Sequence, residues 1–273
     1  MTGRLADKVV VVTGSTRGIG LSIALSCARL GATVVVNGRT EGAVRSAMAD
    51  VRATGATASG VAGSVAEPED VQRLFDHALA EHGRIDVWFN NAGLPGGFRP
   101  LDEFTSDEIL ELVEVNLGGV MLGCRIAVPY FREHGGVIVN LCGRGSRGET
   151  AAFGAAYAAT KAAIASLTRS VAAENRDAAR ITVCGLLPGM VATDFYSDMS
   201  VSPRLTDKVD NVMVALDAFG AGIDEVGRFA ADLAATKPGT GSGEIHSIIT
   251  RTRAMRGVFK LMGARMSGRM KPL

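Results

Sequence analysis

Short runs of apolar residues, rich in valine and isoleucine, recur along the chain. Continuous runs of this kind are typical of strands that are buried on both faces. Between them lie stretches in which apolar residues recur every three or four positions, as in amphipathic helices. The predicted strands are 8–13, 32–37, 85–90, 136–141, 180–187 and 244–250, with a weaker one at 56–62, and the predicted helices are 18–30, 41–54, 67–82, 106–131 and 152–174.

The alternation of these strands and helices predicts the fold class. A strand followed by a helix and a parallel strand forms a right-handed crossover, and repeated crossovers place helices on both faces of one sheet. We therefore expect an α/β fold, a Rossmann-type doubly wound parallel sheet. Since no low-complexity linker divides the 273 residues, residues 1–250 are predicted as one domain with a substrate loop near 194–222. A basic amphipathic helix is predicted over 251–273.

Composition and charge argue against several classes of protein. The 29 basic and 28 acidic side chains leave a formal charge of +1, which does not favour nucleic acid as a partner. Cys27, Cys124, Cys142 and Cys184 show no Cys-x-x-Cys spacing, so neither a disulfide framework nor a metal site is expected. The sequence shows no signal-type leader and no apolar run near the roughly 20 residues that span a bilayer. We expect a cytoplasmic protein.

A glycine-rich segment, TGSTRGIG at 13–20, lies between the first predicted strand and the first predicted helix. In this position glycines permit a tight turn and allow the helix N-terminus to approach a pyrophosphate, whose charge the helix dipole and unpaired N–H groups stabilise. A glycine-rich turn without a ligand is the alternative. We predict a dinucleotide site whose first contacts are Gly14, Ser15, Thr16, Arg17, Gly18, Ile19 and Gly20.

The end of the second strand indicates which dinucleotide binds. NAD enzymes of this architecture place an acidic residue there, on the ribose 2′-hydroxyl, whereas NADP enzymes place a cation near the 2′-phosphate. This chain has Asn37, Gly38 and Arg39. Arg39 and Arg17 can form a clamp on a phosphate, and two solvated surface arginines are the alternative. NADP(H) is the predicted cofactor.

Five motifs occur in an order that is specific to one protein family. They are TGSTRGIG, NNAG at 90–93, Asn116 in VNLGG, Tyr157 and Lys161 in YAATK, and PGMVAT at 188–193. Over about residues 5–195 the chain therefore resembles the short-chain dehydrogenase/reductase family.

The resemblance implies roles for individual residues. It implies that Tyr157 donates a proton to a carbonyl as hydride arrives from the cofactor, and that Lys161 also holds the nicotinamide ribose. Asn116 would perturb its helix and hold a water molecule. The implied cofactor contacts beyond the glycine-rich segment are Asn37, Ser64, Asn90, Ala92, Gly93, Tyr157, Lys161, Pro188, Gly189, Val191 and Thr193. Ser64 stands where most members have an acidic residue.

Tyr157 and Lys161 also suit proton transfer by their spacing. Residues four apart in a helix project from the same face. A free tyrosine titrates near 10, roughly three units above a working pH, so a more acidic phenol needs about 4 kcal/mol of stabilisation of its phenolate. An ammonium group one turn away supplies such stabilisation. The alternative is a half-buried aromatic side chain beside an unrelated surface lysine.

One residue of the family pattern is missing. Most members have a serine that polarises the substrate carbonyl, but its position falls on Gly143 when counted from the strand, or on Arg144 when counted back from Tyr157. Ser146 is the nearest hydroxyl, and the segment N-x-x-G-x-G-S-x-G that contains it resembles the chlorophyll(ide) b reductase branch of the family. Ser146 is therefore the predicted donor to the carbonyl, with Cys142 or a backbone N–H pair as alternatives.

Two further features of the sequence concern substrates and partners. The loops at 94–101, 144–154 and 194–213 favour a bulky hydrophobic substrate, with ordinary lid packing as the alternative. Their apolar rim consists of Phe98, Phe153, Met190, Phe195, Tyr196, Met199 and Met213.

The last 29 residues hold seven basic and no acidic side chains. Apolar residues recur there at helical spacing, so this helix is expected to lie on an anionic membrane surface, cover the substrate mouth, or dock on its own domain or a neighbouring subunit.

The function that we expect is NADP(H)-dependent hydride transfer between nicotinamide and a carbonyl or alcohol. The candidate substrates are a chlorophyll-type formyl group and a ketone of a fatty-acyl, polyketide or steroid-like molecule. Because the family serine is missing, a catalytically silent NADP(H)-binding regulatory or interaction protein is the competing class. The resemblance implies a homodimer or homotetramer, commonly formed through the helices that carry Asn116 and Tyr157.

Overall fold

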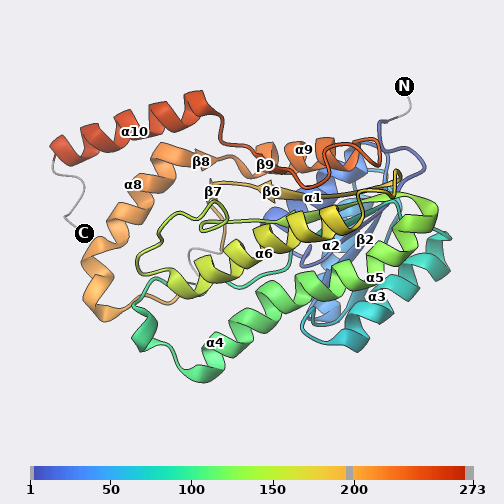
Figure 1. The fold of residues 1–273 in the computed structure, drawn as a ribbon, viewed down its shortest axis with the longest axis horizontal. Helices are drawn as coiled ribbons and strands as arrows, with labels where there is room; N and C mark the ends of the chain where they lie inside the picture. The colour runs from blue at the N-terminus through green and yellow to red at the C-terminus, as the bar shows by residue number, and fades with distance from the viewer. Residues whose placement is uncertain (1–2, 195–198, 268–273) are drawn as a thin grey trace.

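The computed structural model describes residues 3–194 and 199–267. A seven-stranded sheet forms its centre, with the strand order β3-β2-β1-β4-β5-β6-β9 and every neighbouring pair parallel (Figure 1). Helices cover both faces, so the predicted Rossmann-type doubly wound sheet is confirmed. The strands are β1 (Val9–Val12), β2 (Thr33–Gly38), β3 (Ala58–Ala62), β4 (Val87–Asn90), β5 (Gly136–Leu141), β6 (Ile181–Leu187) and β9 (Ile245–Ser247).

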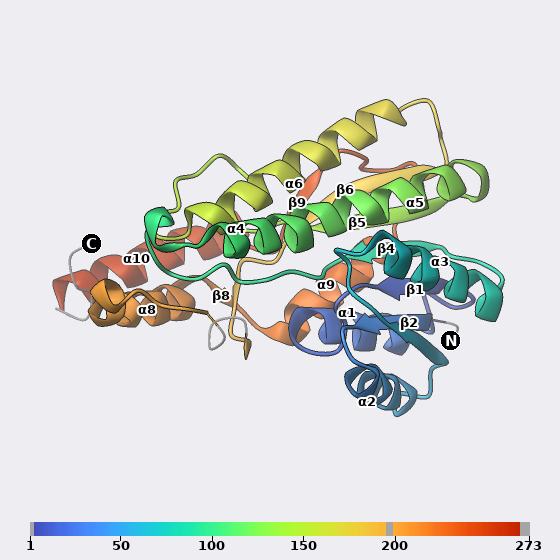
Figure 2. The ribbon, with the colours of Figure 1, turned by 90° about the horizontal axis from the view of Figure 1, so that it is seen from below.

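Burial on both faces explains the continuous apolar runs of the strands. Val10 and Val12 of β1 belong to one core and Val9 and Val11 to the other, because successive side chains of a strand point to opposite faces. The first core lies against α1, α2 and α9, and the second lies against α3, α5 and α6 (Figure 2). These helices are α1 (Gly18–Arg29), α2 (Glu41–Arg52), α3 (Pro68–His82), α5 (Gly119–His134), α6 (Ala155–Glu174) and α9 (Ile223–Ala234).

The helix predicted over 106–131 is interrupted in the structure. Its first part, α4 (Ser106–Val113), begins with a capping box in which Thr105 and Glu108 satisfy each other's backbone N–H groups. Between α4 and α5, the segment η2 (Glu114–Gly118) forms a turn of π-helix. Such wide turns occur mostly inside α-helices and frequently at functional sites. This one contains Asn116, whose side chain is completely buried.

The order of the strands reverses between β1 and β4. From β1 the chain builds β2 and β3 on one side, and it then returns to build β4, β5 and β6 on the other side. At such a switch point the loops after the two central strands turn to opposite faces of the sheet, which leaves a crevice outside their carboxyl ends. The glycine-rich segment follows β1 and the NNAG segment begins in β4, so the two motifs meet at this crevice.

Several elements near the C-terminus go beyond the predicted pattern. The predicted substrate loop, 194–222, contains η3 (Pro203–Lys208), α8 (Val209–Phe219) and the short strand β8 (Gly220–Ala221), which pairs with β7 (Met190–Val191) ahead of the loop. The helix α9 is not among the predicted helices. The last helix, α10 (Arg251–Met266), lies beside α8 at one end of the molecule (Figures 1 and 2). The domain boundary at 250 stays a prediction, and residues 268–273 of the predicted tail helix lie outside the described residues.

The described part of the chain contains no helix that is long and apolar enough to cross a membrane. Its His, Cys, Asp and Glu side chains form no group of three that could hold a metal ion. All four cysteines are buried as free thiols. Burial raises the pKa of the Cys27 and Cys184 thiols to about 12, so these residues act as small apolar side chains of the core.

Candidate active site

The glycine-rich turn after β1 leaves the N-terminus of α1 accessible. Gly14 has a φ of +61°, which favours glycine, and a Cβ on Gly20 would lie 2.3 Å from the Gly14 carbonyl oxygen. Glycine therefore lets the first turn of α1 pack directly on the end of β1. The N-cap residue, Arg17, makes no capping hydrogen bond with its side chain. The first N–H groups of α1 and the helix dipole thus suit a diphosphate, as the sequence predicts.

Two asparagine side chains hold this turn in place. Oδ1 of Asn37 accepts a hydrogen bond from the Gly14 N–H at 3.2 Å, and its Nδ2 donates to two backbone carbonyls at the end of β3, each at 3.2 Å. Nδ2 of Asn91 donates to the carbonyls of Thr13 at 2.9 Å and Gly14 at 3.1 Å. Both amides are used within the protein and shape the turn. Sequence reasoning missed Asn91, although the second asparagine of NNAG was a signal for it.

The two arginines predicted to bind a 2′-phosphate are both exposed. Arg39 directly follows β2. Arg17 has a side chain that is 59% exposed, and its Nη1 lies 3.8 Å from Oδ2 of Asp194. At Gly38 a Cβ would lie 2.3 Å from Cγ2 of Thr16. The last position of β2 therefore has no room for an acidic side chain, and the next side chain along the chain is a cation.

A carboxylate that sequence analysis did not assign lies at the end of β3. Ser64 is predicted there in place of the usual acidic residue, and its Oγ accepts a hydrogen bond from the Ala66 N–H at 3.2 Å. Oδ2 of Asp70, in the first turn of α3, accepts the Ser64 N–H at 2.7 Å. This backbone hydrogen bond, together with the nearby Arg73, holds the pKa of Asp70 below its ordinary value. An acidic group is thus present beside Ser64, supplied from six residues further along the chain.

The side chains of Tyr157 and Lys161, in the first turns of α6, meet the segment that follows β5. The Lys161 side chain is buried, and its Nζ donates to the Leu141 carbonyl oxygen at 2.9 Å. Nζ also lies 5.6 Å from the centroid of the Tyr157 ring. Burial lowers the pKa of Lys161 from the ordinary value of 10.5 to about 8. A cation at this distance, screened from water, favours the phenolate form of a neighbouring tyrosine.

Gly143 lies against the Tyr157 hydroxyl. A Cβ on Gly143 would lie 2.7 Å from that hydroxyl oxygen and 3.0 Å from Cγ of Lys161. Real Cβ atoms essentially never come within 3.0 Å of another heavy atom, so any other residue at position 143 would require the phenol to move. The missing side chain is therefore what allows the Tyr157 hydroxyl to lie against the backbone of this loop.

Ser146, the predicted donor to the carbonyl, is buried and hydrogen-bonded within the protein. Its Oγ accepts from the Gly143 N–H at 3.0 Å and donates to the Lys161 carbonyl at 3.0 Å. A hydroxyl has a single proton, so Ser146 would have to give up the second bond before it could donate to a substrate. Cys142, the alternative donor, belongs to the core on the α6 side of the sheet, where burial raises the pKa of its thiol. Ser146 thus connects the loop after β5 to α6.

Asn116 connects the π-turn to the loop after β4. Its Oδ1 accepts the Leu94 N–H at 2.6 Å, and its Nδ2 donates to the Leu94 carbonyl at 3.0 Å. A Cβ on Gly93 would lie 3.1 Å from this Oδ1 and 3.8 Å from Nζ of Lys161. Gly93 therefore lies between Asn116 and Lys161. The structure brings Asn116, Lys161, Tyr157 and Gly93 to one place, while the water expected at Asn116 stays a prediction.

The Asn90 side chain points into the core and away from the crevice. Its Nδ2 donates to Oδ1 of Asn140 at 2.8 Å, and its Oδ1 accepts from the Trp88 indole N–H at 2.8 Å. A Cβ on Gly123 of α5 would lie 2.0 Å from the Asn90 Oδ1, so α5 covers this amide. The side chain thus cross-links β4 and β5, and the following residues of NNAG face the turn after β1.

The last predicted motif reaches the start of α1. A Cβ on Gly18 would lie 3.9 Å from Cβ and Cγ2 of Thr193, and Oγ1 of Thr193 donates to the Val191 carbonyl at 3.4 Å. Val191 itself is buried in β7. The remaining predicted contacts, which lie in the same loops or in the first turn of α1, are Ser15, Ile19, Ala92, Pro188 and Gly189.

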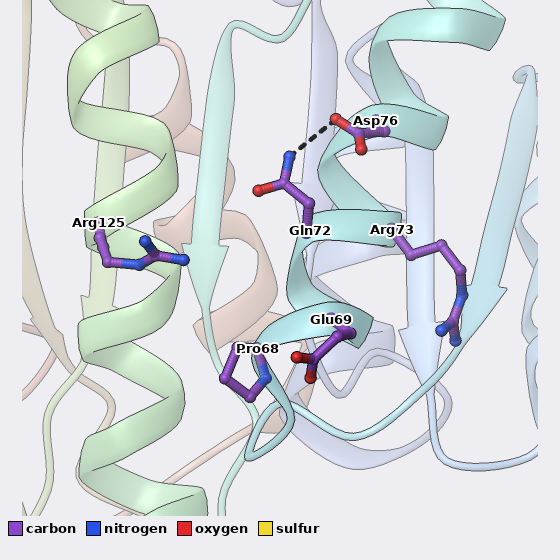
Figure 3. Close-up of a pocket in the computed structure, with 6 residues that line it drawn as sticks. All are labelled: Pro68, Glu69, Gln72, Arg73, Asp76 and Arg125. Atoms are coloured by element: carbon purple, nitrogen blue, oxygen red, sulfur yellow. Dashed lines mark hydrogen bonds between the residues drawn. The ribbon is translucent and has the colours of Figure 1, made fainter.

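A hollow on the outer surface lies apart from these residues. It has a volume of about 380 Å³ and is open to solvent between α3 and α5 (Figure 3). Its side chains carry both signs of charge, and the Gln72 amide donates to Asp76 at 2.9 Å. It contains none of the predicted site residues, and the lining consists of Pro68, Glu69, Gln72, Arg73, Asp76 and Arg125. The candidate active site is therefore the crevice at the carboxyl ends of β1, β4 and β5.

Comparison with known proteins identifies the family of the chain. Residues 8–202 match the model of the short chain dehydrogenase family. A chloroplastic chlorophyll(ide) b reductase of Oryza sativa, NOL, is 36% identical over 192 residues, which are 68% of this chain and 56% of that protein. A 3beta-hydroxysteroid dehydrogenase of Eggerthella lenta is 36% identical over 203 residues, 73% of this chain and 77% of that protein. The chain spans about half the length of the first curated relatives it matches.

A solved structure shares the fold. The 3-ketoacyl-(acyl-carrier-protein) reductase of Brucella melitensis, solved in complex with NADH, superposes with a TM-score of 0.77 at 25% identity and covers 89% of this chain and 97% of its own. The predicted similarity to chlorophyll(ide) b reductases is also confirmed. With a glycine-rich turn at the switch point and a Tyr-x-x-x-Lys pair in α6, the chain belongs to the short-chain dehydrogenase family.

Proposed function

We propose that the protein is an NADP(H)-dependent oxidoreductase that transfers a hydride between nicotinamide and a carbonyl or alcohol group. The observation that supports this most strongly is the buried amine of Lys161 beside the Tyr157 phenol, whose hydroxyl lies against Gly143. A buried cation is costly, so an arrangement of this kind is more often kept for chemistry than for stability.

The residues of the crevice fit a nicotinamide dinucleotide. The glycine-rich turn offers backbone N–H groups at the start of α1, and its tight packing leaves no room for a Cβ on Gly14, beside Ala92, or on Gly20, beside the Gly14 carbonyl. When bound, the cofactor supplies or accepts the hydride. We propose that the N–H groups of residues 14–20 hold its diphosphate, that Lys161 holds the nicotinamide ribose, and that Arg39 and Arg17 hold the 2′-phosphate.

In the direction of reduction, we propose that the Tyr157 hydroxyl gives its proton to the carbonyl oxygen while hydride adds to the carbonyl carbon. The resulting phenolate is stabilised by Lys161 and takes a proton back from solvent, with Asn116 holding the water that connects the two. In oxidation the same steps run in reverse. Tyr157 thus gives up one proton and regains it, and the nearby Lys161 amine favours the phenolate that forms in between, which brings the phenol closer to the working pH, as general acid–base catalysis requires.

We propose a positioning role for Ser146 in place of the direct role that the sequence predicts. Its hydroxyl proton is already used on the Lys161 carbonyl, and its oxygen accepts the Gly143 N–H. These two bonds hold the loop after β5 against α6. They keep Gly143 in contact with the Tyr157 hydroxyl, so Ser146 orients the phenol through the loop and does not contact the substrate itself.

The preference for NADP(H) can be tested at Arg39. We expect Arg39→Ala to weaken NADPH binding by about 10- to 100-fold and to leave NADH binding nearly unchanged, because a charged hydrogen bond to the 2′-phosphate is lost. Dissociation constants are measured by fluorescence titration. Arg45→Ala is the matched control, since Arg45 is also exposed but lies on α2 beside Glu41. Tighter binding of NADH than of NADPH by the wild type would contradict the assignment.

The proposed substrate is a bulky hydrophobic carbonyl or alcohol compound. Phe98 and Phe153 from two of the rim loops pack edge to face with ring centroids 5.6 Å apart, and Met213 on α8 is exposed. Similar proteins are named for chlorophyll(ide) b and for 3beta-hydroxysteroids, and both of these molecules are large and polycyclic. Phe195 and Tyr196 of the predicted rim lie outside the described residues.

Turnover itself is tested with NADPH and a panel of carbonyl compounds. We expect the near-ultraviolet absorbance of NADPH to fall fastest with polycyclic aldehydes and ketones and slowest with small ones, because the rim is apolar. Isolation of the corresponding alcohol confirms hydride transfer. Cofactor binding without oxidation of NADPH by any member of the panel would favour the silent NADP(H)-binding protein instead.

We also propose that the chain forms a homodimer or homotetramer through α4, α5 and α6. Leu110, Val113 and Met121 lie along α4 and α5 and are all exposed, and a second copy would bury them. The cytoplasmic location remains a prediction, and some similar proteins are chloroplastic.

A further inference from the structure

An apolar stripe runs along the outer side of α10. Met255, Phe259, Met262 and Met266 follow one another at intervals of four, three and four residues, which places them on one face of a helix. Their exposed fractions lie between 58% and 90%, and Val258 beside them is also exposed. Large apolar side chains gathered in this way on a surface mark a contact with another molecule or with lipid.

The opposite side of α10 is docked on the protein, so the stripe has a defined direction. Gly257 packs on Phe219 at the end of α8, where a Cβ would lie 2.2 Å from the ring. Arg253 forms a bidentate ion pair with Glu225 of α9 at 2.8 and 2.9 Å, and Nζ of Lys260 lies 3.5 Å from Oδ2 of Asp217. These contacts turn the stripe outwards at the end of the molecule where α8 and α10 lie together (Figure 1).

The charges around the stripe are positive. No acidic residue occurs after Glu244, and Glu225 and Asp217 form ion pairs with Arg253 and Lys260 of α10. Arg256 and Arg265 are exposed. Within residues 3–194 and 199–267, neither has a carboxylate oxygen within 4.0 Å. On a helical projection they lie on opposite sides of the stripe, so the apolar side chains are bordered by unneutralised cations.

We propose that α10 binds an anionic lipid surface and lies in the plane of the bilayer interface. Apolar side chains enter the boundary between headgroups and acyl chains, and arginines at the borders of the stripe reach lipid phosphates. The 16 residues of α10 span about 24 Å, less than the hydrocarbon thickness of about 30 Å, which fits a helix that lies on the surface. Methionine suits this contact because its flexible side chain adapts to a fluid partner.

Charge also distinguishes lipid from a second copy of the chain. A two-fold contact between two α10 helices would bring Arg256 and Arg265 of both copies together with no acidic side chain on either helix to offset them, and like charges at an interface weaken association. Phosphate-rich lipid presents the opposite charge. Binding would also bring α8, part of the predicted substrate loop, to the membrane surface. The idea that a hydrophobic substrate meets the protein at this surface rests on the proposed function, whereas the contact of α10 with lipid does not.

The test is sedimentation of the full chain with vesicles made of equal parts phosphatidylglycerol and phosphatidylcholine, and with vesicles of phosphatidylcholine alone. We expect binding to the mixed vesicles only. Phe259→Ser combined with Met262→Ser should lower the partition coefficient at least about tenfold. Arg256→Gln combined with Arg265→Gln should also lower it. Arg45→Gln, on α2, is a matched control at an exposed position and should bind like the wild type.

Two results would overturn the proposal. The first is a failure of vesicle binding to depend on the stripe: either the wild-type protein stays in solution with the mixed vesicles, or the variant with Phe259 and Met262 replaced binds them as well as the wild type does. The second is a variant with the same substitutions that binds vesicles like the wild type but has a different oligomeric state, measured by sedimentation velocity. That result would identify the stripe as a contact between copies of the chain. NADPH binding without vesicles is measured for every variant, so a folding defect or a failure of the proposed enzymatic function is recognised separately.

Discussion

Replacing Tyr157 by phenylalanine is expected to lower kcat for NADPH-dependent carbonyl reduction by about 10³-fold and to leave NADPH affinity within about threefold of the wild-type value. Phenylalanine keeps the ring that packs beside Lys161 but removes the hydroxyl that lies against Gly143. Only the proton donor is lost. Single-turnover kinetics and NADPH titration measure the two quantities separately.

Tyr130→Phe is the matched control for this substitution. Tyr130 lies on α5 and its hydroxyl oxygen accepts a weak hydrogen bond from the Ile85 N–H at 3.4 Å, away from the crevice, so kcat should stay within about twofold of the wild-type value. If Tyr157→Phe kept wild-type turnover, another group would supply the proton and the proposed mechanism would be wrong.

Replacing Lys161 by methionine is expected to lower kcat by about 10²-fold and to increase the free energy of unfolding at pH 7. The activity falls because the phenolate of Tyr157 loses its cation. The stability rises because methionine has a similar length and removes a charge that burial makes costly. The lost hydrogen bond to the Leu141 carbonyl offsets part of this gain.

The pKa of Lys161 determines how the free energy of unfolding of the wild type changes with pH. In the folded protein Lys161 titrates at about 8, against 10.5 for an ordinary lysine. Between these two values the unfolded chain binds the proton and the folded chain does not, so the free energy of unfolding of the wild type rises with pH. Below pH 8 both states are protonated and the penalty is fully present. The advantage of Lys161→Met should therefore be greatest below pH 8 and shrink by about 3 kcal/mol as the pH rises to 10.5.

Urea unfolding at a series of pH values measures this change. Lys8→Met is the control, because Lys8 is partly exposed and pairs with Asp86 at 3.0 Å, so its removal should give no gain in stability at pH 7. A stability difference between Lys161→Met and the wild type that stays constant from pH 7 to about 10.5 would show that the Lys161 amine is not held in a desolvated site.

Much of the active site could be predicted from the sequence because its motifs depend on local chain geometry. The glycine-rich segment needs only a strand before it and a helix after it, and the Tyr157–Lys161 pair needs only one helical turn. Residues that act through contacts distant in the sequence could not be assigned in this way. Asn91 supports the turn after β1, and Asp70 supplies a carboxylate to the end of β3, and neither relation has a local pattern.

The interrupted helix at Asn116 has the same explanation. Apolar periodicity continues through 106–131 and by itself predicts one helix, and only the family resemblance implies that Asn116 perturbs it, as the structure shows. The π-turn there is accompanied by two hydrogen bonds between the buried amide of Asn116 and the backbone of Leu94, which lies in another loop: the amide accepts one and donates the other. An unsatisfied buried amide would be costly, and this cost becomes apparent only when the two loops are brought together.

The sequence by itself determined the order of strands and helices, the doubly wound sheet, the glycine-rich turn and the Tyr157–Lys161 pair, because hydrophobic period and short spacing are properties of neighbouring residues. Only the tertiary structure decided that Ser146 bonds back to α6, that Asn90 faces the core, that Gly143 lies against the phenol, and that α10 turns its apolar stripe outwards. These depend on which loops and helices meet at the edge and at the end of the sheet. Such contacts follow from packing over the whole chain, and no local pattern encodes them.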